Sequence, residues 1–269
     1  MASYLLIKPP NQSVLSLIGG HGVAQGNGTV LNVDFQNTPA FLALRSTQPL
    51  YQAIREGLQQ GLRNPQIARD MGGEASDFQM AIWMKELTEI TLMDFIFSQQ
   101  DRVGNIDYKW ELYTYDAAKG VVDSQSIDSK VARAAMKSIA LPLVPTGVTA
   151  YLVQRSHISD NDAGGRVQYA NFTKRTTMLQ KIRHLNLETY RKLLALADDL
   201  NRHGDLYNYF KSNFTLDDGQ VAQIVNNTNE AANIYKATCH SGQLRFDLYH
   251  AKALLNGSAK EVTADCDHP

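Results

Sequence analysis

The spacing of apolar and polar residues predicts a short N-terminal part rich in strands. Short apolar runs at 4–7, 14–18, 29–35 and 41–45 are typical of strands, and a glycine-rich turn covers residues 19–28. Residues 50–62 instead place leucine or isoleucine on one helical stripe. These elements together predict a small β-rich lobe over residues 1–72.

The rest of the chain, residues 73–269, is predicted to be mostly helical. Residues 73–98 favour one or two helices, and 86–97 are apolar nearly all round, which indicates burial. Strands are expected at 106–113 and 147–158, with a polar, alanine-rich surface excursion at 116–140 between them. Helical patterns follow from 177 to 255, clearest at 187–197 and 220–237. The expected fold is therefore α+β, with a small β-rich lobe and a larger helical lobe.

Composition limits the classes of partner. The chain is 43% hydrophobic and 20% charged with a formal net charge of −1, so no overall field favours nucleic acid or a membrane surface. No apolar stretch reaches the ~18 residues expected of a spanning helix. The first residues are interrupted too soon by Lys8 for a signal peptide. We expect a cytoplasmic protein or the mature part of an exported one, without nucleic-acid partners.

The two cysteines leave the redox environment open. Cys239 and Cys266 could close one disulfide, which would indicate an oxidising compartment. Low cysteine use is also typical of a reducing cytosol, and on that ground two free thiols are favoured.

A polar segment follows the apolar run that begins at Asp94. It contains Asp101, Arg102 and Asn105. Phosphoryl transfer needs a carboxylate that orients the attacking hydroxyl and an oxygen ligand for the metal on the phosphates. Asp101 and Arg102 are therefore the predicted catalytic residues, and Asn105 is a predicted metal ligand. The alternative is that Asp101 caps the next turn or pairs with Arg102.

A second acidic segment follows the predicted strand 147–158. Asp160 and Asp162 flank Asn161 in a glycine-rich turn, and a carboxylate there could hold the metal. We favour Asp160 as the ligand because it comes first after the strand. An ordinary turn is the alternative; a calcium loop of the EF-hand type is excluded because the required glutamate is missing.

Phosphate-binding residues are expected in the N-terminal part. The turn 19–28, with Gly20 and Gly22, could cover a triphosphate with backbone N–H groups, or it could be a long hairpin turn. By order along the chain, Arg45 is the predicted phosphate-binding cation and Glu56 its helix partner, with Lys8 as the alternative cation. Each cation could equally be a solvated surface charge.

Residues 94–102, Asp-Phe-Ile-Phe-Ser-Gln-Gln-Asp-Arg, resemble the catalytic segment of secretory-pathway kinases of the four-jointed and Golgi casein kinase type. They are also similar to the catalytic loops of type II phosphatidylinositol 4-kinases and HipA-like kinases. Residues 160–162 resemble the later metal-binding turn of those families. The resemblance covers roughly residues 85–110 and 148–195. It departs from the family pattern at Gln99, at the position of Asn105, and in the lack of an evident phosphate lysine.

The resemblance implies an atypical ATP-dependent kinase that uses Mg²⁺ or Mn²⁺ and transfers a phosphoryl group to a hydroxyl, most often of a protein serine or threonine. A pseudokinase that binds nucleotide without turnover, and a lipid or small-molecule kinase, are the alternatives. A purely structural or interaction protein is the third. The sequence contains no motif for a hydrolase or redox enzyme.

Overall fold

The computed structural model describes residues 5–7, 35–71, 75–99, 102, 106–137, 144–145, 147–158, 171–214 and 216–269. The described helices are α2 (Pro39–Leu44), α3 (Leu50–Gly61), α4 (Pro65–Met71), α5 (Asp77–Ile96), α6 (Ser129–Lys137), α7 (Phe172–Arg175), α8 (Leu187–Asn201), α9 (Asp205–Asn213), α10 (Asp218–His240) and α11 (Ala251–Leu255), with 3-10 turns η1 (Phe35–Asn37) and η2 (Leu179–Lys181). The strands are β1 (Leu5–Ile7), β2 (Ile106–Asp116), β3 (Val121–Ile127), β4 (Thr149–Ile158), β5 (His184–Leu185) and β6 (Arg245–Phe246). The fold is α+β, and helices make up most of it.

The main sheet has the strand order β1-β4-β2-β3. Strand β2 pairs antiparallel with β4 on one side and with β3 on the other. The short β1 pairs in parallel with the other side of β4. Strands β2 and β4 are neighbours in the sheet, although β3 and α6 lie between them in the sequence. Their pairing runs from Ile106 opposite Ile158 to Tyr115 opposite Thr149. The register therefore places the start of β2 beside the end of β4.

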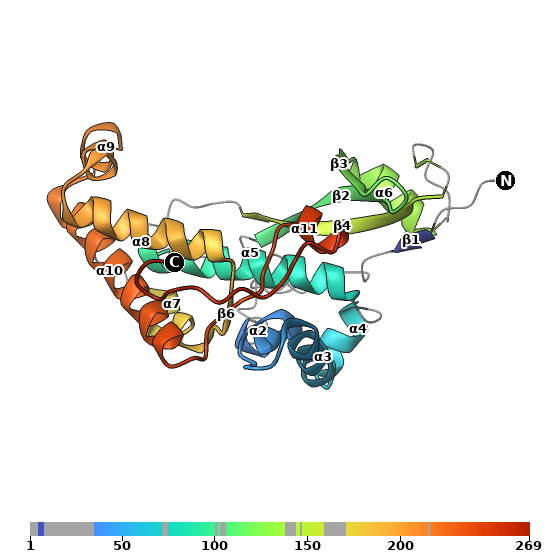
Figure 1. Ribbon diagram of the computed structural model, residues 1–269, viewed down its shortest axis with the longest axis horizontal. Helices are drawn as coiled ribbons and strands as arrows, with labels where there is room; N and C mark the ends of the chain where they lie inside the picture. Colours follow the sequence, from blue (N-terminus) through green and yellow to red (C-terminus); the bar gives the residue numbers. More distant parts are fainter. Residues whose placement is uncertain are drawn as a thin grey trace, which may run out of the picture.

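Helix α5 runs through the centre of the molecule, between the sheet and the helices α2–α4 (Figure 1). It begins at Ser76, whose hydroxyl accepts a hydrogen bond from the Gln79 N–H and caps the first turn. Its N-terminal half packs on α2 and α3, where Trp83 shares a core cluster with Phe41 and Ile54. A helix that is apolar nearly all round is stable only when it is buried, and the surrounding elements bury α5.

The C-terminal half of α5 belongs to a second core cluster. Phe95 and Ile96 pack there with Tyr190 of α8 and Tyr235 of α10. Helices α8 and α10 lie side by side at the end of the molecule away from the sheet, and the C-terminal tail crosses the molecule to reach them (Figure 1). Helix α5 thus connects the sheet, the α2–α4 group and the α8–α10 pair.

Most predicted elements are confirmed. The strands expected at 4–7, 106–113 and 147–158 are β1, β2 and β4, and the helices expected at 50–62, 73–98, 187–197 and 220–237 are α3, α5, α8 and α10. The described part of the predicted excursion 116–140, residues 116–137, is largely exposed, as predicted, but it contains β3 and α6. The predicted strand at 14–18 and the glycine-rich turn lie outside the described residues, as does the strand at 29–35 except its last residue, which begins η1.

The strand predicted at 41–45 is wrong. Residues 41–44 form the end of α2, which has Pro39 at its first position and Arg45 as its C-cap. The apolar run is buried on nearly all sides because α2 packs against α3. A short apolar run of this kind fits a buried helix as well as a strand. The two-lobed arrangement and its boundary at residue 72 stay predictions.

Cys239 at the end of α10 and Cys266 in the tail form a disulfide, with their Cα atoms 5.7 Å apart. The favoured expectation of two free thiols is therefore wrong. In the described part of the chain, no helix has the length and apolar character needed to cross a membrane.

Candidate functional site

The chain makes a sharp turn where α5 ends. Phe97 caps the helix, and Ser98 follows with a φ of 53°, in the left-handed region that L-residues seldom adopt. The Gln99 N–H then donates back to the Asp94 carbonyl at 3.0 Å. In the sequence, this turn comes three residues before Asp101. A serine in this conformation needs support from its surroundings.

Two buried asparagines supply that support. The Asn227 side-chain amide, on α10, donates to the Ile96 carbonyl at 3.1 Å and to the Ser98 hydroxyl at 2.9 Å. The Asn171 amide, just before α7, donates to the Phe95 carbonyl at 2.7 Å and reaches the same hydroxyl at 3.4 Å. Together they satisfy two carbonyls at the helix end that have no partner within the helix. The turn is therefore fixed by contacts from two distant parts of the sequence.

An ion pair fastens the segment a few residues further on. Arg102 donates through Nε to Asp94 Oδ2 at 2.9 Å and through Nη2 to Asp94 Oδ1 at 2.7 Å. Arg102 is only 4% exposed and Asp94 only 3%. Burial raises the pKa of Asp94, and the hydrogen bonds from Arg102 oppose that rise. The partner of Arg102 in this pair is Asp94, a pairing that the sequence did not indicate.

The sheet places the ends of β2 and β4 together at this site. Ile106, the first residue of β2, is the register partner of Ile158, the last residue of β4. In the sequence, Asn105 directly precedes Ile106 and Ser159 directly follows Ile158. The predicted catalytic segment and the predicted metal-binding segment are thus attached to adjacent strand ends.

A mostly apolar cavity of about 420 Å³ lies beside the ion pair. Asp94 and Arg102 form one wall, and Ile158 at the end of β4 also contributes. The remaining lining residues are Met93, Phe97, Gln99, Phe210, Phe214, Leu216 and Ile224. Such a cavity can bury an apolar group of a ligand while the adjoining segments carry polar groups.

Most residues predicted for the site lie outside the described residues, namely Lys8, Gly20, Gly22, Asp101, Asn105, Asp160 and Asp162. The described ones are Arg102, Arg45 and Glu56. Arg45 is exposed at the end of α2, and Glu56 lies on α3. The Glu56 carboxylate accepts from the Ser46 hydroxyl at 2.9 Å and from the Gln52 amide at 3.2 Å. Among the described residues, Arg45 and Glu56 form no ion pair with each other.

The sequence analysis missed the residues that hold the turn, which are Asp94, Ser98, Asn171 and Asn227. Asp94 carried a usable signal, because an acid within a helix that is otherwise apolar requires a buried partner. The two asparagines carried none, because each is an ordinary polar residue far from the turn in sequence. Within the described residues, no group of histidine, cysteine, aspartate and glutamate is arranged to hold a metal ion.

Comparisons with known protein families, with curated proteins and with solved structures find no match.

Proposed function

We propose that the protein is an atypical kinase that transfers the γ-phosphoryl group of ATP to a hydroxyl. The favoured acceptor is a protein serine or threonine. The observation that carries this proposal is the pairing of Ile106 with Ile158. It attaches the segment with Asp101 and Asn105 and the segment with Asp160 and Asp162 to neighbouring strand ends. A phosphotransferase needs these two functions, a carboxylate at the acceptor and a metal site at the phosphates, close together.

The anchored turn gives the proposal a physical basis. Phosphoryl transfer depends mainly on positioning and electrostatic stabilisation, so the segment that carries the acceptor-orienting carboxylate must be held firmly. Asn171 and Asn227 hold the chain before Asp101, and the ion pair with Asp94 holds it directly after, at Arg102. In this proposal Arg102 is a positioning residue.

The proposed reaction forms a bond between the acceptor oxygen and the γ-phosphorus and breaks the bond from that phosphorus to the oxygen of ADP. The hydroxyl proton passes to the Asp101 carboxylate. Asn105 and Asp160 are the proposed ligands of Mg²⁺ or Mn²⁺, and Asp162 is the second choice. The metal would neutralise charge on the phosphates.

Radiolabelled ATP, with Mg²⁺ or Mn²⁺ and a generic protein acceptor, tests the proposal. Asp101→Ala should abolish transfer while the protein stays folded. Asp123→Ala, which removes an exposed carboxylate on β3, is the matched control and should transfer normally. Near-normal turnover by Asp101→Ala would remove the assigned role. No transfer by the unsubstituted protein with protein, lipid or small-molecule acceptors would contradict an active kinase.

The choice of metal ligand is tested separately. Asp160→Ala should weaken metal-dependent ATP binding more than Asp162→Ala, because Asp160 comes first after β4. Titration of both variants with ATP and Mg²⁺ decides between them, and a larger loss with Asp162→Ala would reverse the assignment.

A second candidate function is a pseudokinase that binds nucleotide as a regulatory module. It is favoured by the placement of Arg45 and Glu56 on helices that do not pair them with each other. Nucleotide-dependent thermal stabilisation without turnover would support it. In an active kinase, Arg45→Ala and Lys8→Ala compared side by side would identify the phosphate-binding cation. The order of elements along the chain favours Arg45, and a silent Arg45→Ala with an inactive Lys8→Ala would assign that role to Lys8.

The disulfide bears on where such a kinase would act. Structural disulfides form and persist mainly in oxidising compartments. The Cys239–Cys266 bond therefore supports a proposed site of action in such a compartment. Mass spectrometry of protein from its native source, with and without reductant, would test this, and two free thiols would contradict it.

A further inference from the structure

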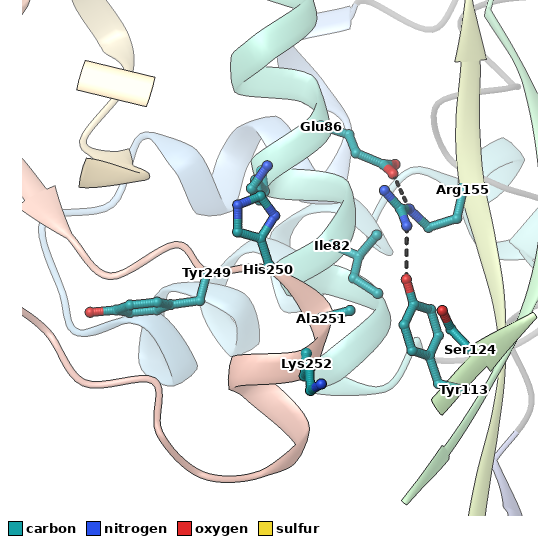
Figure 2. A pocket seen from close by; sticks show the side chains of 10 residues that line it. Ile82, Glu86, Tyr113, Ser124, Arg155, Tyr249, His250, Ala251 and Lys252 are labelled. Atoms are coloured by element: carbon teal, nitrogen blue, oxygen red, sulfur yellow. Dashed lines mark hydrogen bonds and ion pairs between the residues drawn. The ribbon is translucent and has the colours of Figure 1, made fainter. Parts of the chain in front are cut away.

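A second cavity, of about 220 Å³, lies beside the N-terminal half of α5, away from the turn at Ser98. It is formed by α5, by the strands β2, β3 and β4, and by residues 249–252 at the start of α11. Its polar lining includes Lys85, Glu86, Tyr113, Ser124, Arg155 and Lys252 (Figure 2). The proposed kinase reaction uses none of these residues.

Arg155 is held in place from two sides. Its Nε donates to Glu86, and its Nη1 donates to Glu111 at 2.6 Å and to the Tyr113 hydroxyl at 2.8 Å. Figure 2 shows the guanidinium between Glu86 and Tyr113. Its side chain is still 38% exposed, and within the described chain its Nη2 has no hydrogen-bond partner. A fixed guanidinium with an unused N–H edge is preorganised to bind an oxyanion.

Other donors face the same cavity. Lys252 is exposed and has no counter-ion in the part of the chain that the structure describes, and the Ser124 hydroxyl has no partner there either. Lys85 is largely buried and pairs with Glu89 at 2.6 Å through one of its three N–H groups. Burial raises the pKa of Tyr113 to about 12, so its hydroxyl keeps its proton at neutral pH. That proton is already donated to Glu111 at 2.9 Å, so Tyr113 helps to hold Arg155 and is not counted as a donor to the ligand.

The acids near the cavity are already occupied. Glu86 is the only acid among the lining residues; one of its oxygens accepts from Arg155 and the other from the Ser156 N–H at 2.9 Å. Glu111 binds Arg155 from the sheet side, and Glu89 binds Lys85. These three carboxylates balance the charges of Lys85, Arg155 and Lys252, so a bound anion would be held mainly by directed hydrogen bonds and by Lys252, which has no counter-ion among the described residues. The cavity has an excess of donors over acceptors.

We propose that this cavity binds a phosphate group, as a phosphomonoester or as the free anion. A phosphate presents several strong acceptor oxygens in a tetrahedral arrangement. Donors from α5, β3, β4 and the start of α11 approach from different directions, which suits a tetrahedral anion better than a planar carboxylate. The balanced charge of the surroundings predicts modest affinity, and the contribution of exposed Lys252 falls with added salt. This proposal does not depend on the kinase proposal.

Isothermal titration calorimetry tests the inference with two probes, O-phosphoserine and inorganic phosphate, each at matched ionic strength. The unsubstituted protein should bind at least one of them, and Lys252→Gln should raise its Kd at least ~10-fold, the loss of about 1.4 kcal/mol. Ser124→Ala should raise the Kd several-fold. Both residues are exposed, so both variants should fold. Arg155 is a poor first target because its loss would leave Glu86 buried without its partner.

Lys130→Gln is the matched control, because it removes an exposed lysine on α6, outside the cavity lining. It should bind as the unsubstituted protein does. Binding of O-phosphoserine identifies a phosphomonoester site, and binding of inorganic phosphate alone identifies a site for the free anion. The inference is overturned if neither probe binds, or if Lys252→Gln and Lys130→Gln have the same Kd.

Discussion

Asp94→Asn should destabilise the protein strongly, because it removes one charge of a buried pair. The substitution keeps the size of the side chain, so it creates no cavity and its cost is mainly electrostatic. Arg102, 4% exposed, would lose the negative charge of Asp94 and one of the two charge-assisted hydrogen bonds that join the pair. Breaking a buried pair from one side costs about 3–5 kcal/mol. That is a large part of the ~5–15 kcal/mol that stabilises a typical domain.

Urea denaturation followed by circular dichroism measures the free energy of unfolding. The matched control is Asp198→Asn, which breaks the pair with Arg202, where the side chains are 58% and 72% exposed. The control should cost at most about 1 kcal/mol, because solvent screens an exposed pair. A cost for Asp94→Asn no larger than the control would refute the reasoning.

A double-mutant cycle separates the ion pair from other effects. Arg102→Met alone should also destabilise, because it leaves the Asp94 carboxylate buried without its cation. The combination of Asp94→Asn with Arg102→Met should be less destabilising than the sum of the two single changes, by about 2 kcal/mol or more. Strict additivity would mean that the two side chains do not stabilise each other.

Three further outcomes are expected from chemical denaturation of single sites. Replacing Cys239 and Cys266 together by serine should cost about 3–4 kcal/mol in the chain-entropy model, because their sequence separation is 27 residues. Equal stability of this variant and the unsubstituted protein under oxidising conditions would contradict a stabilising disulfide. Asn227→Ala should cost about 1–3 kcal/mol, because it leaves buried acceptors unsatisfied. Asn229→Ala, which removes a half-buried amide on α10 that bonds only with Asn201 among the described residues, should cost less, and equal costs would remove the special role of the buried amide. Gly57→Ala should cost about 1–3 kcal/mol, because a Cβ there would lie 2.5 Å from the Pro39 carbonyl oxygen. The control is Gln60→Ala, on the exposed side of α3, and an equally small loss of stability in both variants would show that α2 moves away freely.

The long elements were predictable because they repeat their pattern over many residues. Helix α10 also carries a complete local start signal, in which Asp217 and Gln220 cap each other's backbone N–H groups. The prediction at α2 was wrong for the opposite reason, since a run of a few apolar residues does not distinguish a strand from a buried helix. Pro39 at its first position was the one local cue for a helix.

The contacts that hold the candidate site were not predictable, because they join residues that are far apart in the sequence. Asn227 meets Ser98 only because α10 packs against α5. Which acid pairs with Arg102 depends on how the chain turns after α5. In the sequence Asp101 is nearer to Arg102, but the ion pair is formed with Asp94. Two cysteines alone likewise do not determine whether they pair, since pairing requires their Cα atoms to come within about 7 Å.

The pairing of Tyr115 with Thr149 has a consequence for protein engineering. It brings residues 116 and 148 near each other, so the excursion between them, which includes β3 and α6, begins and ends at one place. Loop-closure entropy depends weakly on length, and shortening this excursion roughly eight-fold would change it by only about 2 kcal/mol. Strand β3 nevertheless covers the edge of β2, and a bare edge invites pairing with another chain. The turn between β2 and β3, at Gly120, is therefore a better point for inserting a tag or a reporter domain than a place to delete residues.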